Sequence, residues 1–187
     1  MSSTTTPNES VPSDDGVHCA FFYGTLMVPD VFYTVCYNTK DVPPAIAALH
    51  TFQPAILHGY CRRRVKMADY PGIIPDANHS VVGVFATGLT AANLAKLDMF
   101  EGSEYERRTV TVKLLDRVGN LKDGEGQVEG EERKAQVYVY LHEKWLEEKE
   151  WDLEEFRREK LKLWTRAGHI FDDCNPDNPA KVASEDS

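Results

Sequence analysis

Hydrophobic and polar residues alternate along several segments of the chain, which is the pattern of β-strands with one buried face. In residues 109–114 the valines and a leucine occupy every second position, and in residues 136–140 two valines alternate with two tyrosines. Neighbouring side chains of a strand point to opposite faces, so each segment can turn one face towards a core. Strands are predicted at residues 19–23, 55–65, 81–89, 107–115 and 134–141.

Two other segments carry apolar residues at the spacing of an amphipathic helix. Thr90 is suited to cap the first helix, in which Leu94 and Leu97 share a face and lead the chain to Glu101. The second helix is predicted at residues 152–164, whose first residue is an aspartate that can cap it. The first helix therefore aims a carboxylate from its C-terminal end.

The order of these elements indicates the fold class. The chain has no internal repeat and no regular alternation of strands with long helices, which would be typical of a doubly wound parallel sheet. We expect an α+β fold with a small, mainly antiparallel β-barrel flanked by a few helices. The domain is expected at residues 17–170, because residues 1–16 and 171–187 have little to bury and are predicted to be disordered tails. Residues 116–133, rich in glycine and charge, are predicted to be a long hairpin connection.

Composition and charge exclude several functions. The 187 residues, of which 42% are hydrophobic, suffice for one core. A net charge of -9 argues against general binding to nucleic acid or to an anionic membrane, and a strand would split the basic residues 62–64 between two faces. No segment has the apolar length of a membrane span or the features of a signal peptide, and the four cysteines show no C-x-x-C spacing. A cytoplasmic protein with reduced thiols is predicted, and its oligomeric state stays open.

The common catalytic motifs are missing from the sequence. Its six histidines form neither an H-E-x-x-H motif nor a His/Cys group with metal-ligand spacing. There is no G-x-S-x-G elbow, no Walker loop and no G-x-G-x-x-G fingerprint. We therefore expect neither a metal nor another cofactor.

Two short strings carry the candidate chemistry. Residues 21–26 read Phe-Phe-Tyr-Gly-Thr-Leu, a buried strand that stops at a glycine and opens a tight turn whose backbone N–H groups can hold an anion. Residues 100–105 read Phe-Glu-Gly-Ser-Glu-Tyr and place Glu101 between an aromatic residue and a glycine, directly after the first predicted helix. A carboxylate partly shielded from water in this way is suited to act as a general base.

Taken together, Tyr23–Leu26, Glu101, Tyr105, the string at residues 70–73 and the helix start at residue 152 resemble the gamma-glutamylcyclotransferase-like superfamily, specifically its plant and fungal avirulence-induced-gene-like branch. The resemblance covers about residues 19–164 and implies a small β-barrel with a pocket at its mouth. It also implies that the turn binds the amino and carboxylate groups of a gamma-glutamyl substrate. The implied binding residues are Tyr23, Gly24, Thr25, Leu26, Met27, Val28 and Tyr105, and the implied catalytic residue is Glu101.

The implied reaction needs no cofactor. The α-amine of a small gamma-glutamyl amide attacks its own gamma-carbonyl, yields 5-oxoproline and expels an amine or amino acid. Glu101 accepts a proton first and returns it afterwards, and burial near Phe100 is expected to raise its pKa. The acidic neighbours Asp98 and Glu104 are expected to pair elsewhere or to face water, and Tyr70 is expected to form a turn. Gamma-glutamyl amino acids, gamma-glutamyl amines and glutathione-like conjugates all stay open as substrates.

A protein of another class also fits the sequence. A non-catalytic binding module could keep the same pocket for a glutamyl-like ligand or for a protein partner. The presence of Glu101 favours catalysis, because a binding module does not require an acid beside a substrate amine.

Overall fold

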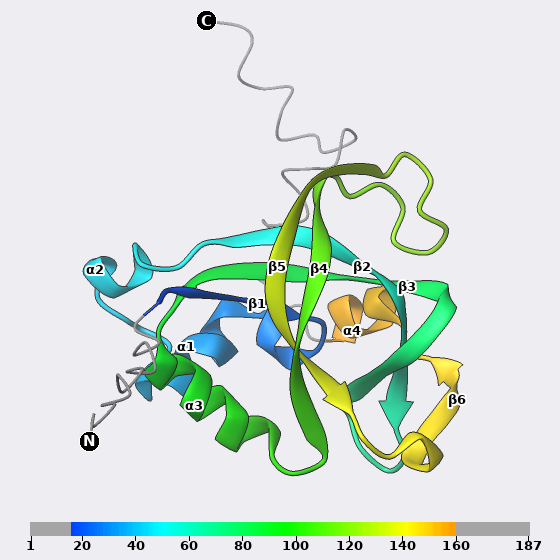
Figure 1. Ribbon diagram of the computed structural model, residues 1–187, viewed down its shortest axis with the longest axis horizontal. Helices are drawn as coiled ribbons and strands as arrows, with labels where there is room; N and C mark the ends of the chain where they lie inside the picture. The colour runs from blue at the N-terminus through cyan, green and yellow to red at the C-terminus, as the bar shows by residue number, and fades with distance from the viewer. Residues whose placement is uncertain (1–15, 160–187) are drawn as a thin grey trace, which may run out of the picture.

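The computed structural model describes residues 16–159, and within them six strands form one sheet (Figure 1). The strand order is β3-β1-β5-β4-β2-β6, and β2 also pairs with β3, so that the first five strands close into a ring. All pairings are antiparallel except the one between β1 and β5. The strands are β1 (His18–Phe22), β2 (Phe52–Val65), β3 (Pro71–Leu89), β4 (Tyr105–Arg117), β5 (Val128–Tyr140) and β6 (Leu146–Glu150).

Helices and short turns join and cover these strands. Figure 1 shows α1 and α3 side by side at one end of the ring and β6 at the other. The helices are α1 (Pro29–Tyr37), α2 (Pro44–Ala47), α3 (Ala91–Glu101) and α4 (Leu153–Glu159), with 3-10 turns η1 (Thr25–Met27) and η2 (Glu143–Trp145). The predicted α+β class with a mainly antiparallel sheet is confirmed, and we describe the sheet as a ring.

The ring has two faces, and the strands divide their side chains between them. Phe21 of β1 and Val137 and Val139 of β5 belong to a cluster to which all five ring strands contribute, which places it inside the ring. Their neighbours Phe22 and Tyr138 belong to a second cluster on the outer face. The alternation of valine and tyrosine predicted for β5 is therefore confirmed.

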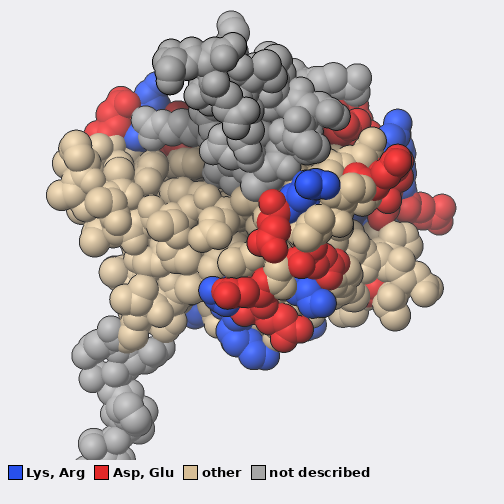
Figure 2. Space-filling view, turned by 90° about the horizontal axis from the view of Figure 1, so that it is seen from above, with Lys and Arg blue, Asp and Glu red and all other residues tan. Residues whose placement is uncertain are grey.

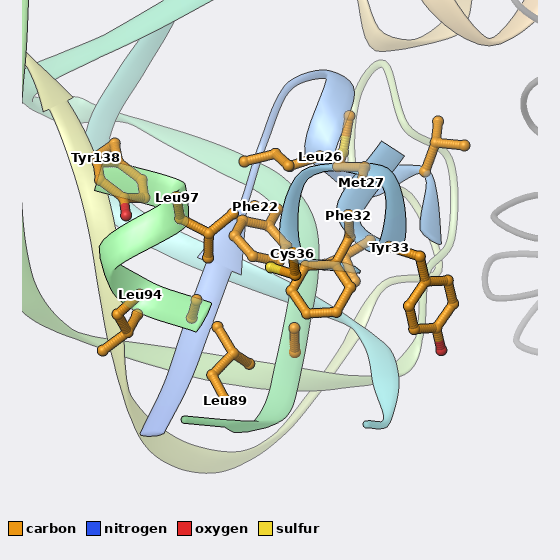
Figure 3. Packing of buried hydrophobic residues seen from close by; sticks show 14 of the residues in the cluster. Phe22, Leu26, Met27, Phe32, Tyr33, Cys36, Leu89, Leu94, Leu97 and Tyr138 are labelled. Atoms are coloured by element: carbon orange, nitrogen blue, oxygen red, sulfur yellow. The ribbon is translucent and has the colours of Figure 1, made fainter. Parts of the chain in front are cut away.

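The outer cluster joins the sheet to the helices. Figure 3 shows Phe22 of β1 lying between Leu97 of α3 and Phe32 of α1. Leu153 and Phe156 of α4 belong to the same cluster. The apolar and aromatic segment after η1, for which no element was predicted, thus forms a helix that packs on the sheet.

Helix α3 begins and ends where its sequence dictates. Thr90 Oγ1 accepts a hydrogen bond from the backbone N–H of Asn93 at 3.1 Å, and the Asn93 side chain accepts one from the Thr90 N–H at 3.0 Å. At the other end Gly102 adopts a φ of 77°, a conformation that favours glycine, and its N–H bonds to the carbonyl of Asp98 at 3.1 Å. Glu101 is thus fixed as the last residue of the helix.

Several predicted boundaries were wrong. Strand β3 starts at Pro71, ten residues before the predicted strand, and β6 was not predicted. The connection between β4 and β5 comprises residues 118–127 instead of 116–133, because the hairpin ladder continues to the pair Arg117 and Val128. The sequence placed this boundary at the charged and glycine-rich residues, yet these residues still pair as strands.

Some expectations are not tested by the fold. The predicted tails, apart from residue 16, and the last five residues of the predicted last helix, 160–164, lie outside the described residues. Within the described residues no helix is long and apolar enough to cross a membrane. On the face shown in Figure 2, acidic and basic side chains lie interspersed. The cytoplasmic location and the domain boundaries stay predictions.

Candidate active site

A cavity of about 480 Å³ opens where β1 leaves the sheet. Its walls come from the η1 turn, the β2–β3 connection, the end of α3, the start of β4, strand β5 and helix α4. Segments far apart in the sequence therefore meet here. The lining residues are Phe21, Phe22, Tyr23, Gly24, Thr25, Leu26, Asp69, Tyr70, Pro71, Phe100, Glu101, Glu104, Tyr105, Tyr138 and Phe156.

The turn at Gly24 forms one wall. A Cβ atom on Gly24 would lie 3.2 Å from Cδ of Pro71, so glycine allows the turn to approach β3 closely. The backbone N–H of Met27 bonds to the Gly24 carbonyl at 3.0 Å, and that of Val28 to the Thr25 carbonyl at 3.1 Å. The side chains of Met27 and Val28 are buried in the outer cluster and do not line the cavity.

A buried arginine, which was not predicted as a site residue, supports this turn by binding the backbone that precedes it. Arg62 is 8% exposed, and its Nη1 donates hydrogen bonds of 2.9 Å to the carbonyls of Tyr23 and Val82. Its guanidinium lies 4.9 Å from the ring centre of Trp151. Burial lowers the pKa of Arg62 to about 10, so the group stays charged at neutral pH. Arg62 thereby fixes the backbone just before Gly24.

The Glu101 carboxyl group lies in the cavity without a partner. No hydrogen bond or ion pair reaches it from any residue in the described range 16–159. Burial raises the pKa of Glu101 from 4.5 to about 7. A lone carboxylate in such a place is costly because neither a donor nor a cation compensates its lost hydration.

Three tyrosines surround this carboxyl group. Burial raises the pKa of Tyr23, Tyr105 and Tyr138, and the charge of Glu101 raises all three further. Their hydroxyl protons go elsewhere: Tyr23 donates to the Tyr138 carbonyl at 2.6 Å, and Tyr105 donates to the Pro71 carbonyl at 3.0 Å. Tyr138 donates to Oδ1 of Asp98 at 2.8 Å. None of the three hydroxyls therefore donates to Glu101, which stays free to take a proton.

The remaining acidic and aromatic candidates fall into two groups. Asp98 does not line the cavity and pairs with Arg107 Nε at 2.9 Å, as expected for a residue paired with a neighbour. Glu104 is exposed but lies at the rim. Tyr70, for which a turn was favoured over a place in the pocket, lines the cavity.

The aromatic residues differ in how much they shield the site. Phe100 is 50% exposed, so the burial of Glu101 depends on the other walls as well. Phe156 of α4 is buried and completes the cavity. Neither Phe156 nor Tyr138 was predicted as a site residue, because nothing local in the sequence links them to Glu101.

These features define a small α+β protein in which a buried acid and a backbone turn line one cavity. Residues 20–158 match the family "Gamma-glutamyl cyclotransferase, AIG2-like". The chain belongs to this family.

Individual relatives extend over most of the chain. Protein AIG2 C of Arabidopsis thaliana is 32% identical over 146 residues, which cover 78% of this chain and 75% of the relative. Protein AIG2 B of the same plant is 32% identical over 174 residues, covering 90% and 88%. The solution structure of an Arabidopsis thaliana protein is similar with a TM-score of 0.54 and 29% identity, covering 95% of this chain and 94% of that one.

Proposed function

We propose that this protein is a cofactor-independent gamma-glutamylcyclotransferase that converts a small gamma-glutamyl amide to 5-oxoproline. The observation that supports the proposal is the unpaired Glu101 carboxyl group, which shares one cavity with the Gly24 turn. Membership of the family agrees with this activity. A protein that only needed stability would gain by replacing such a group with an apolar one.

The pKa of Glu101 suits the proton transfer that cyclisation needs. The α-amine of the substrate has a pKa of about 8 and is mostly protonated at neutral pH, so it must lose a proton before it attacks. An ordinary glutamate would make this transfer uphill by about 5 kcal/mol, whereas a pKa of about 7 reduces the cost to between about 1 and 2 kcal/mol. Burial thus tunes Glu101 to the base strength that the reaction requires.

The reaction balances with Glu101 alone. The α-ammonium gives one proton to the carboxylate, and the free amine nitrogen then bonds to the gamma-carbonyl carbon. The bond from that carbon to the departing nitrogen breaks as the proton on Glu101 moves to the departing nitrogen. The ring nitrogen still carries one extra proton, which the ionised Glu101 takes and passes to the released amine, so that the amine leaves as an ammonium ion. Glu101 returns to its ionised form, and each turnover leaves the protein unchanged.

The turn supplies the binding of the substrate head group. The backbone N–H groups of Thr25 and Leu26 make no hydrogen bond to any residue in the described part of the chain. Both residues line the same cavity as Glu101. A substrate α-carboxylate bound there would hold the α-amine near Glu101 and the chain in a bent form, and such orientation is worth about 7 to 11 kcal/mol in favourable cases.

The charges around the cavity bear on the leaving group. Asp69, Glu101 and Glu104 line it, and none of its described lining residues is a lysine or an arginine. Arg64 pairs with Asp69 at 3.6 Å from outside the lining. This balance favours gamma-glutamyl amines with a neutral or positively charged leaving group over conjugates whose leaving group carries carboxylates.

The test is to measure 5-oxoproline release from gamma-glutamyl amino acids, gamma-glutamyl amines and glutathione. We expect turnover by the wild type, loss of turnover in Glu101→Gln, and full activity in the matched control Glu106→Gln. Glu106 is exposed and pairs with Arg108, so its replacement leaves the cavity intact. If the wild type binds these compounds and converts none, the protein is a binding module and the proposal fails.

A further inference from the structure

A second group of reactive side chains lies away from the cavity, where β6 meets β2 (Figure 1). Cys61 of β2, His79 of β3 and Glu150 of β6 bring one thiol, one imidazole and one carboxylate together. The ligand atoms of the three residues all lie within 4.8 Å of one another. Cys61 Sγ is 3.8 Å from Glu150 Oε1, and His79 Nε2 is 3.6 Å from the same oxygen.

These separations suit a tetrahedral metal ion. Ligands at about 2.0 to 2.3 Å from a zinc ion lie between about 3.3 and 3.6 Å from each other. The distance from Cys61 Sγ to Glu150 Oε1 exceeds that range by little, and the distance from His79 Nε2 to the same oxygen lies at its upper end. The remaining separation, between Cys61 and His79, is at most 4.8 Å, and rotations of the His79 and Glu150 side chains, which are 41% and 59% exposed, can shorten it.

We propose that Cys61, His79 and Glu150 form a binding site for a divalent transition-metal ion, with Zn²⁺ as the best match. Sulfur, nitrogen and oxygen donors in a tetrahedral arrangement are typical of zinc sites. Three protein ligands leave one position for water, which the exposure of His79 and Glu150 makes accessible. The sequence predicted no metal site because the three ligands come from strands that are far apart along the chain.

The histidine has the orientation that a metal ligand requires. His79 Nδ1 lies 3.0 Å from Oδ2 of Asp76, which leaves Nε2 directed towards Glu150. A carboxylate on the second nitrogen fixes the tautomer and the ring orientation of metal-binding histidines. Asp76 therefore orients the His79 ring before any metal ion binds.

The neighbouring arginines are compatible with this assignment. Burial raises the pKa of the Cys61 thiol and Arg63 offsets this only in part, so a metal ion bound here would itself displace the thiol proton. Arg63 also contacts Glu143 at 3.9 Å, so it has a second partner when a cation is present. On Glu150 the neighbouring charge is that of Arg62, which two backbone carbonyls hold in place.

A metal ion here would attach the edge strand β6 to the ring. Strand β6 leads directly to Trp151 and then to α4, which supplies Phe156 to the cavity. The pairing of β6 with β2 is short, with Arg63 opposite Glu150 and Val65 opposite Leu146. Metal binding would therefore stabilise the segment that carries one wall of the cavity.

Titration of the full chain with Zn²⁺ tests the site directly. After treatment with a chelator and a phosphine reductant, calorimetry should show one ion bound per chain, and the melting temperature should rise with Zn²⁺. Cys61→Ser and His79→Gln should each weaken binding by at least about tenfold, and Asp76→Asn by about tenfold. The control His58→Gln, which removes an exposed histidine bonded to Glu129, should leave the affinity unchanged.

Cobalt provides a second readout that does not depend on the folding of one variant. Co²⁺ bound to the wild type should show the intense near-ultraviolet absorption of a thiolate ligand, and Glu150→Gln, an exposed change, should weaken its binding. The proposal is overturned if the wild type binds no Zn²⁺, if Zn²⁺ binds equally well to Cys61→Ser and His79→Gln, or if Co²⁺ shows no thiolate band. None of these outcomes depends on cyclotransferase activity.

Discussion

The two carboxylates near the end of α3 are one helical turn apart and differ in their surroundings. Asp98 accepts a hydrogen bond from Tyr138 and pairs with Arg107, both within 2.9 Å. Glu101 has no such partner among the described residues, and burial raises its pKa to about 7. Compensation makes Asp98 a structural acid, whereas the lack of it makes Glu101 a base of useful strength. The role proposed for Glu101 follows from what surrounds its carboxylate, because the residue types are nearly the same.

The largest effect on activity is expected when Glu101 is replaced by its amide, and the same replacement of Asp98 provides the comparison. Glu101→Gln should reduce kcat/KM by about 10² to 10⁴-fold, because it removes the only proton acceptor proposed for the substrate amine. Asp98→Asn should reduce it by less than about tenfold, since Tyr138 keeps a neutral acceptor. Steady-state kinetics of 5-oxoproline formation measures both. Equal losses in the two variants would contradict the distinction between them.

The stability of the folded protein should increase in Glu101→Gln, although its activity falls. The pKa of Glu101 is raised in the folded state, so its contribution to stability is present below the unfolded value of 4.5 and is lost as the pH rises through about 7. Glu101→Gln should therefore gain up to about 3 kcal/mol relative to the wild type between pH 4.5 and pH 8. Urea unfolding at several pH values measures this difference. A difference that does not change with pH would show that Glu101 is not desolvated.

The pH dependence of the rate sharpens the same comparison. The ionised form of Glu101 is the active base, so kcat/KM should rise about tenfold per pH unit below pH 7 and then level off. In Asp98→Asn the midpoint of this rise should stay in place, because no contact joins the two carboxylates in the described structure. A midpoint near 4.5 in the wild type would assign the proton transfer to an ordinary, hydrated acid.

The smallest effect, a loss of stability, is expected when Tyr138, which donates a hydrogen bond to Asp98, is replaced by phenylalanine. Tyr138→Phe removes the hydrogen bond of 2.8 Å to Asp98 and should cost about 1 kcal/mol of stability, since Asp98 keeps Arg107. Tyr105→Phe, which loses the bond to the Pro71 carbonyl, is the matched change on the other side of Glu101. Thermal unfolding of both variants measures the cost. If Tyr138→Phe loses activity as fully as Glu101→Gln, then Tyr138 takes part in the chemistry.

Local patterns predicted much of the sheet and the end of α3. The alternation in β5 and the cap at Thr90 follow from neighbouring residues, so the sequence alone was sufficient. The first half of β3 was missed because Pro71, Gly72 and Pro75 are typical turn residues and because polar residues follow them. Strand β6, with four charged residues in five, has no hydrophobic alternation and is held by its pairing with β2.

The site was predictable only where its parts lie in short strings. Glu101 and the Gly24 turn were found from their immediate neighbours. Tyr138, Phe156 and Arg62 reach the site through strand pairing and helix packing, which a single sequence does not reveal. The partners of Asp98 were equally hidden, so the sequence could not tell which of the two α3 acids was compensated.

The ring of strands is closed at two places where neighbouring strands share only one or two residue pairs, and we call these two pairings the seams. In the described structure β1 meets β5 at one residue pair, Ala20 with Gln136, and β2 meets β4 at two. The hairpin of β4 and β5 between these seams is bonded along most of its length, and it carries Tyr105 and Tyr138. Because the hairpin keeps its own ladder, we expect it to move as one unit, within the limits that Val137 and Val139 set by packing inside the ring. Amide hydrogen exchange should then be fastest along the two seams.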